Sequence, residues 1–70
     1  MRNIVRELRM ARGWTQEQLG EKVGVSRQAI IAIESGKYDP SLPLAIKLAR
    51  TLRKSVEGIF LLEDDDFARA

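Results

Sequence analysis

The sequence predicts a single small all-α domain of five helices, and three observations lead to that prediction. Apolar residues recur every three or four positions along most of the 70-residue chain, which is the spacing of a helix with one buried face. A serine or threonine able to cap a helix precedes four of these segments. No internal repeat or low-complexity segment interrupts the pattern, so the helices form one continuous series.

The first predicted helix covers about residues 3–12. Ile4 and Leu8 recur at helical spacing, and the pattern stops at Gly13, a residue type that commonly ends a helix.

A capping box predicts the start of the second helix. The Thr15 hydroxyl can accept a hydrogen bond from the Gln18 N–H, while the Gln18 side chain accepts one from the Thr15 N–H. Trp14 before the cap and Leu19 inside the helix are placed to pack together and fix the angle at which the chain enters. The helix is expected to end near Val23.

Two glycines predict a tight turn between the second and third helices. Only Gly24 and Val25 separate them, so Gly24 is expected to adopt a left-handed conformation. Ser26 caps the third helix, which runs to about Ser35. Gly20 lies inside the second helix, where glycine costs about 1 kcal/mol relative to alanine. We therefore expect the third helix to cross closely over Gly20 and to leave no room for a side chain.

Serines also predict the last two helices. Ser41 follows a turn at residues 38–40 and begins a fourth helix, in which leucines at positions 44, 48 and 52 form a buried stripe. Ser55 begins a short fifth helix over residues 56–60. The acidic segment 63–70 is expected to be a frayed tail, which leaves residues 1–62 as the folded domain.

Composition excludes several classes of function. The chain has no cysteine and no histidine, which removes disulfides, zinc sites built from these residues and the usual general base of an enzyme. It also has no glycine loop able to hold a phosphate. We predict a protein that is not an enzyme and needs no cofactor or metal. The longest apolar runs, residues 29–33 and 59–62, are far shorter than the roughly 20 residues that span a membrane. With no apolar secretory core at the N-terminus, a cytoplasmic protein is expected.

Positive charge is concentrated in the N-terminal half. Residues 1–37 carry seven Lys and Arg against four Asp and Glu, whereas residues 38–70 carry five against six. An ordinary mixed surface would explain the charge alone. The third helix adds a second feature, because Ile30 and Ile33 set its buried direction and the opposite face buries nothing within one subunit. That outer face contains Gln28, Ile31, Ala32 and Ser35.

These features resemble the phage-repressor and Cro-type helix-turn-helix family of small stand-alone transcriptional regulators. The resemblance covers roughly residues 4–62, including the stretches LRMARGWTQEQLGEKVGVSRQAIIAIESGKYDPSL and LAIKLARTLRKSVEGIF. The matching motif positions are Gln16, Gly20, Gly24, Val25, Ile30 and Ile33. The resemblance implies a five-helix repressor-like domain that binds double-stranded DNA, with the N-terminal residues of the third helix in the major groove.

The resemblance also implies which residues meet DNA. Arg27, Gln28 and Ala32 match groove-facing positions, and their chemistry agrees, since Arg pairs with guanine, Gln with adenine and apolar groups with the thymine methyl. The N-terminus of the second helix offers N–H groups and a positive dipole end to a phosphate. The predicted DNA-binding residues are Thr15, Gln16, Ser26, Arg27, Gln28, Ile31, Ala32, Lys37 and Tyr38.

Two structural features follow from the same resemblance. A pair that joins the first helix to the end of the third maps to Arg9 and Glu34. The turn before the fifth helix places Arg53 where relatives have glycine or asparagine, so a left-handed conformation there would cost about 1 kcal/mol.

A homodimer is expected, because one helix in one groove covers too few bases to select a site. In similar regulators the fifth helix, sometimes with a short strand after it, joins the subunits. The candidate interface is Val56, Ile59, Phe60, Leu61 and Leu62, although these residues could instead close the subunit's own core. The predicted function is a repressor that occupies a palindromic operator. The alternatives are an antitoxin-type protein-interaction module that also binds DNA, and a non-specific nucleoid binder.

Overall fold

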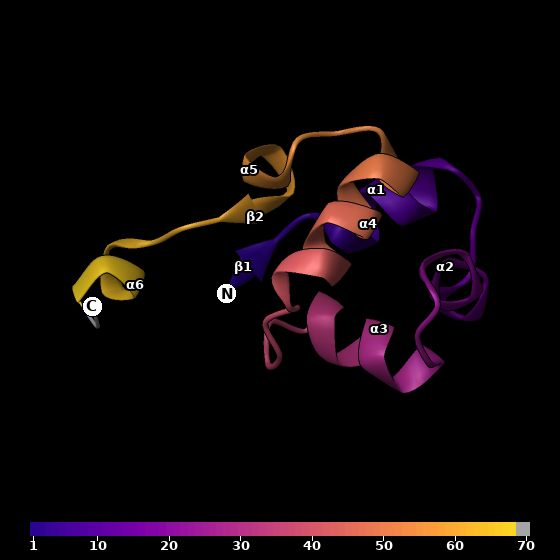
Figure 1. Ribbon diagram of the computed structural model, residues 1–70, viewed down its shortest axis with the longest axis horizontal. Coiled ribbons are helices and arrows are strands. Elements are labelled where there is room, and N and C mark those ends of the chain that lie inside the picture. The colour runs from indigo at the N-terminus through magenta and orange to yellow at the C-terminus, as the bar shows by residue number, and fades with distance from the viewer. Residues whose placement is uncertain (69–70) are drawn as a thin grey trace.

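The computed structural model describes residues 1–68, which form six helices and a two-stranded antiparallel sheet (Figure 1). The helices are α1 (Val5–Ala11), α2 (Gln16–Val23), α3 (Arg27–Glu34), α4 (Leu42–Leu52), α5 (Val56–Ile59) and α6 (Asp64–Ala68). The strands are β1 (Arg2–Asn3) and β2 (Phe60–Leu61), paired with Arg2 opposite Leu61 and Asn3 opposite Phe60. The first five helices pack into one body, and α6 projects from it (Figure 1).

The predicted caps are confirmed. Thr15 and Gln18 form a complete capping box, in which the Gln18 N–H donates to Thr15 Oγ1 at 3.0 Å and the Thr15 N–H to Gln18 Oε1 at 2.8 Å. The hydroxyls of Ser26, Ser41 and Ser55 each accept from the backbone N–H three residues on. The sequence therefore fixes the starts of four helices through local hydrogen bonds.

The left-handed positions are also confirmed. Gly24 ends α2 with φ 78°, and Arg53 ends α4 with φ 55°. At Gly20 a Cβ would lie 2.7 Å from the carbonyl oxygen of Val25 and 3.4 Å from backbone atoms of Ser26. The space is therefore taken by the turn and by the N-cap of α3, so the close approach predicted over Gly20 occurs at the start of α3. The requirement for a missing side chain stands.

The first helix is shorter than predicted, because its first residues form a strand. Arg2 and Asn3 pair with β2, and α1 begins at Val5 instead of near residue 3. Asn3 is held by its own side chain, whose amide donates to the Ile33 carbonyl at 2.8 Å and whose oxygen accepts from the Val5 N–H at 3.1 Å. These bonds take the place of helical ones at Asn3.

The C-terminal region differs from the prediction in two ways. The fifth helix ends at Ile59, one residue early, because Phe60 turns into β2, the short strand that the family resemblance allowed. The expected frayed tail contains α6, a helix with three acidic residues in its first turn. Negative charges at this end of a helix interact favourably with its dipole and stabilise it. The Glu63 N–H donates to Asp66 Oδ2 at 2.7 Å, a local bond that starts this helix. Residues 69 and 70 of the predicted tail lie outside the described residues.

One apolar core lies between the helices of the body. It is formed by Val5, Leu19, Val23, Ile30, Ile33, Leu44, Ala45, Leu48, Leu52, Ile59 and Phe60. Trp14, Leu8 and Val56 pack against it from the edge. The core fixes how α3 sits against α2 and α4, so the outer face of α3 has a defined place on the surface. No helix in residues 1–68 has both the length and the apolar character needed to cross a membrane.

Candidate nucleic-acid interface

Helix α3 has one face in the core and one face open. Ile30 and Ile33 are completely buried, whereas Arg27 and Gln28 in the first turn are exposed. Ile31 and Ala32 are partly exposed and Ser35 is exposed, so the predicted outer face is accessible along its length. Ser26 is exposed as well, but its hydroxyl already accepts from the Ala29 N–H at 3.2 Å. Its main role in this structure is the cap of α3.

A buried ion pair joins α1 to the C-terminal end of α3. Arg9 Nε donates to Glu34 Oε2 at 2.7 Å and Arg9 Nη2 to Glu34 Oε1 at 3.2 Å, and the two side chains are only 11% and 5% exposed. Arg9 Nη1 also donates to the Trp14 carbonyl at 2.8 Å. The predicted pair is therefore confirmed, and it also ties down the chain just before α2.

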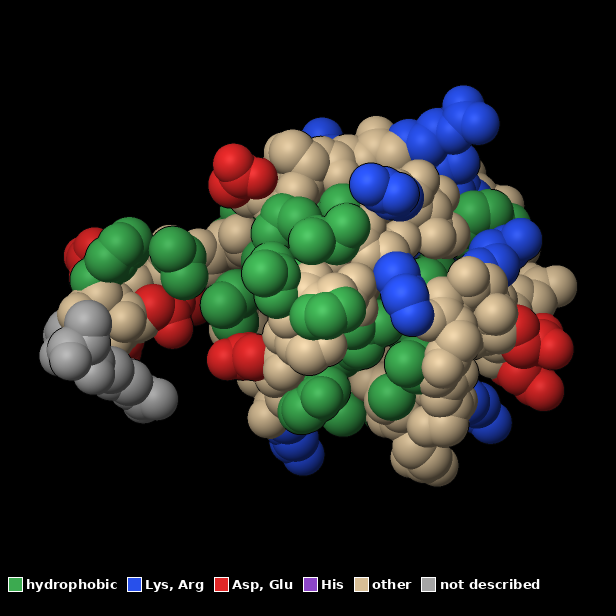
Figure 2. Space-filling model, in the orientation of Figure 1, with side chains coloured by type: hydrophobic (Ala, Val, Ile, Leu, Met, Phe, Trp, Pro, Cys, Tyr) green, Lys and Arg blue, Asp and Glu red, His purple; other side chains and the backbone are tan. Residues whose placement is uncertain are grey.

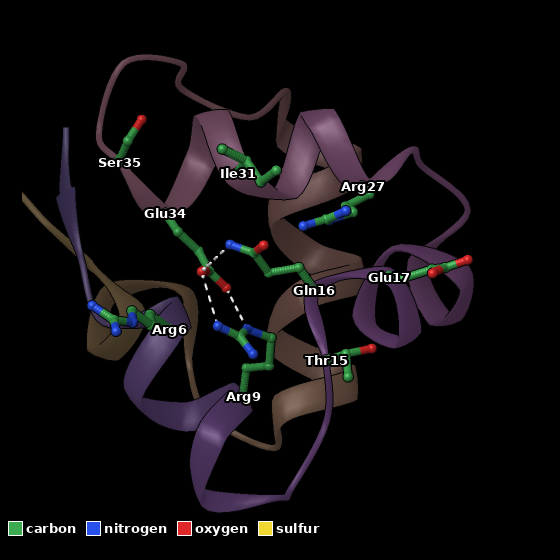
Figure 3. A pocket seen from close by; sticks show the side chains of 9 residues that line it. All are labelled: Arg6, Arg9, Thr15, Gln16, Glu17, Arg27, Ile31, Glu34 and Ser35. Carbon is green, nitrogen blue, oxygen red and sulfur yellow. Dashed lines mark hydrogen bonds and ion pairs between the residues drawn. The ribbon is translucent and has the colours of Figure 1, made fainter.

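Gln16 belongs to the same network (Figure 3). Its side-chain amide donates to Glu34 Oε1 at 3.2 Å, so Glu34 connects α1, the start of α2 and the end of α3. The backbone N–H of Gln16 is a further donor for a ligand, because the first N–H groups of a helix have no partner within it. Thr15, the cap of α2, is exposed beside it.

A hollow of about 750 Å³ lies between α1, the start of α2 and α3. Figure 3 shows the Arg9, Gln16 and Glu34 network at its centre, with Arg27 at one side and Arg6 at the other. Glu34 is already paired with Arg9, and exposed Arg6 and Arg27 outnumber Glu17, so the hollow carries a net positive charge. The lining residues are Arg6, Arg9, Thr15, Gln16, Glu17, Arg27, Ile31, Glu34 and Ser35.

The fold and the relatives agree on a family. Two helices joined by a tight left-handed turn, with the second presenting an open face, form the helix-turn-helix arrangement. The sequence model of the helix-turn-helix family matches residues 5–59. The chain belongs to the helix-turn-helix family. Helix-turn-helix domains bind DNA through the second helix of the motif, which here is α3.

Relatives and solved structures support this membership. An uncharacterized HTH-type transcriptional regulator of Methanothermobacter thermautotrophicus is 54% identical over 66 residues, covering 93% of this chain and 96% of the relative. A second, from Methanocaldococcus jannaschii, is 53% identical over 66 residues, with 94% and 100% covered. The crystal structure of the restriction-modification controller protein C.AhdI from Aeromonas hydrophila superposes with a TM-score of 0.73 at 36% identity, over 80% of this chain and 85% of that one.

The predicted DNA-binding residues include a group at the hollow beside α3 and a pair beyond the end of α3. Thr15, Gln16, Arg27 and Ile31 line the same hollow. Lys37 and Tyr38 are exposed beyond the end of α3, and their backbone N–H groups both donate to the Ala32 carbonyl at 3.2 Å. Their backbone N–H groups are therefore already used, and their exposed side chains are the donors that a ligand can meet.

Arg6 is a candidate that sequence reasoning missed. It lies on α1, outside the motif, and reaches the hollow only because α1 packs against α3. The signal in the sequence was its position three residues before Arg9, which places both on one side of a helix.

The predicted dimer residues divide into core and surface. Ile59 is completely buried in the core of the subunit, so the surface that this segment offers a partner comes from its neighbours. Phe60 is 7% exposed and belongs mainly to the core. Val56 and Leu61 are partly exposed, and Leu62 is 57% exposed. The turn from α5 into β2 explains the difference, because it directs Ile59 and Phe60 inward.

Proposed function

We propose that this protein is a sequence-specific DNA-binding transcriptional regulator, acting in the cytoplasm as a repressor that occupies a palindromic operator as a homodimer. The observation that carries the proposal is the open outer face of α3, which presents Arg27 and Gln28 in its first turn. Neither side chain is needed for packing, and both have the donor groups that read bases in the major groove. The folded unit for this function is residues 1–62.

In the proposed complex, base reading belongs to the first half of α3. Arg27 pairs with guanine and Gln28 with adenine, each with about 1–3 kcal/mol of discrimination. Ile31 and Ala32, which are partly exposed, pack against a thymine methyl. Ser26 contacts a phosphate through the side of its hydroxyl that the Ala29 N–H does not use.

Backbone contacts flank the reading face on both sides. The N–H groups at the start of α2, next to Thr15 and Gln16, receive a phosphate, and Arg6 supplies a charge at the same hollow. Lys37 and Tyr38 contact a second phosphate beyond the end of α3. These contacts position α3 but carry no sequence information.

Selection of bound duplexes from a random pool, followed by sequencing, tests this function. The expected result is a palindromic consensus whose half-sites are about 34 Å, or one helical turn, apart. A non-palindromic consensus would contradict the homodimer, and no enrichment at all would favour a non-specific nucleoid binder. Placing the selected operator over a promoter and measuring transcription with and without the protein then tests repression.

A further inference from the structure

An apolar groove crosses the face of the molecule formed by α4, α5 and the start of the chain. Two adjoining hollows of about 450 and 230 Å³ form it, and both are lined by Met1, Val56 and Phe60. The first also has Glu57, Leu61 and Leu62, and the second Pro40, Leu42 and Ala45. Figure 2 shows hydrophobic side chains gathered on this face of the body.

The α6 arm, residues 63–68, carries an apolar side chain that its own subunit leaves in solvent. Phe67 is 66% exposed, although burying such a ring stabilises a protein by about 1.5–3 kcal/mol. The arm extends beyond β2 (Figure 1), and none of the residues that line the groove comes from α6. Glu63, Asp65 and Asp66 of the arm instead line a separate hollow with Met1 and Arg2.

We propose that the α6 arm of a second copy of this chain docks on the groove, with Phe67 of each subunit filling the hollow of its partner. This exchange of arms rests on the proposed homodimer and names a contact that holds it together. The arm lies at the end of the same chain segment, β2 and Leu62, that borders the groove. In the proposed dimer the two-fold axis passes near Leu62, so that each arm crosses to the partner's groove.

Charge favours the same occupant. Residues 1–62 carry eleven Lys and Arg against six Asp and Glu, whereas residues 63–70 carry four acidic residues against one Arg. Leu42, Ile46 and Arg50 are exposed and four residues apart on α4, so a basic side chain continues the apolar stripe. Lys54 lies against Gly58 of α5 at the other side of the face. Glu57 lines the first hollow and would repel the acidic arm, so Phe67 fills the second hollow, beside Leu42, and acidic residues 64–66 lie toward the cation at Arg50.

The exchange also enlarges the interface, which would otherwise be small because Ile59 is buried within its own subunit. A stable interface buries about 800 Å² on each partner. With Ile59 inside the core and Phe60 nearly so, the surface of Val56, Leu61 and Leu62 is small. The arm adds Phe67 and its flanking acidic residues on each side of the two-fold axis, so every arm residue counts twice.

Cross-linking between two single-cysteine variants tests the exchange, because the chain has no cysteine of its own. Asp64→Cys protein, which keeps Phe67, is labelled with ¹⁵N and mixed with unlabelled Leu42→Cys protein, and a short thiol-to-thiol cross-linker is added. The expected product is a heavy–light dimer by mass spectrometry. Met10→Cys replaces Leu42→Cys as the control, since Met10 is 57% exposed on α1, outside the groove.

Sedimentation of the unmodified chain separates the two proposals. A monomer at every concentration would overturn the homodimer itself. A dimer that gives no more product with Leu42→Cys than with Met10→Cys would overturn the exchange and leave the homodimer standing. An Asp64→Cys, Leu42→Cys double variant that links within one chain would show that the arm folds back, which also overturns it. In support, Phe67→Ala should raise the dimer Kd about tenfold or more, and Met10→Ala should leave it unchanged.

Discussion

At the scale of single residues, the open face of α3 separates base reading from backbone contact. Gln28→Ala should relax preference at one base pair by about 1–3 kcal/mol and leave affinity for random DNA nearly unchanged. Lys37→Ala should weaken binding to all sequences alike and lower the slope of log K against log salt by about 1. Affinities of both variants are measured on operator and random duplexes at several salt concentrations. An equal loss of affinity on both duplexes for Gln28→Ala would contradict its role in reading bases.

An ion pair between the N-terminal ammonium of Met1 and Asp39 makes stability depend on pH. The Met1 ammonium donates to Asp39 Oδ1 at 2.9 Å, and this bond raises the pKa of the ammonium above its ordinary 8.0. A raised pKa means that the contact stabilises the fold below pH 8 and is lost as pH rises through the folded-state pKa.

Removing this ion pair should therefore lower the stability of the fold near neutral pH but not at high pH. Asp39→Asn should lower the thermal midpoint slightly at pH 7, since an exposed pair contributes little, and should match the unchanged chain at high pH. Melting curves from pH 7 to 10, on protein that begins at Met1 without a tag, measure the difference. A gap between the two proteins that widens with pH would contradict the assignment.

At the scale of elements, the turn between α2 and α3 depends on the missing side chain at position 20. Gly20→Val should destabilise the protein by about 1–3 kcal/mol, because its Cβ would lie 2.7 Å from the Val25 carbonyl oxygen. Glu21→Val, at the exposed neighbouring position, is the control for helix propensity. Urea unfolding followed by circular dichroism gives both values. Valine is a better helix former than glycine, so a more stable Gly20→Val would refute the close approach.

The connection between α1 and α3 makes a second element-scale prediction. Glu34→Ala should cost about 3–5 kcal/mol, since it leaves the guanidinium of Arg9 buried without its partner. Replacing both, with Arg9→Met and Glu34→Leu, should recover much of that loss because no buried charge remains. The free energies of unfolding in urea decide between them. A double variant no more stable than Glu34→Ala would contradict the cost assigned to the unpaired guanidinium of Arg9.

Sequence reasoning succeeded for elements whose signals are local. Thr15 and the three capping serines mark helix starts with bonds to residues three positions on, and Gly24 marks the turn. It failed where the partner is distant. Asn3 forms a strand because Phe60 pairs with it and Ile33 accepts its amide, neither of which the sequence places nearby.

The candidate site shows the same division. Helical periodicity alone predicted that Arg27 and Gln28 are exposed, because the apolar residues of α3 show which side of the helix faces the core. The bond from Gln16 to Glu34 and the approach of Arg6 to the same hollow depend on how α1 packs against α3. Tertiary packing of that kind leaves no local pattern in a single sequence.

At the scale of the whole molecule, DNA affinity depends on assembly, because two linked reading heads bind an operator far more tightly than one. Leu61→Asp should give monomers and weaken operator binding by about 10²-fold or more.

A second variant separates loss of the dimer from loss of the fold, because Leu61 also pairs with Arg2 in the sheet. Leu62→Asp changes a residue that is 57% exposed and lies outside the strand. Met10→Asp is the matched control, with the same exposure on α1. Sedimentation, circular dichroism and operator titration on each variant should show folded monomers for Leu62→Asp and unchanged dimers for Met10→Asp. A fully dimeric Leu62→Asp protein would place the subunit contact on another face.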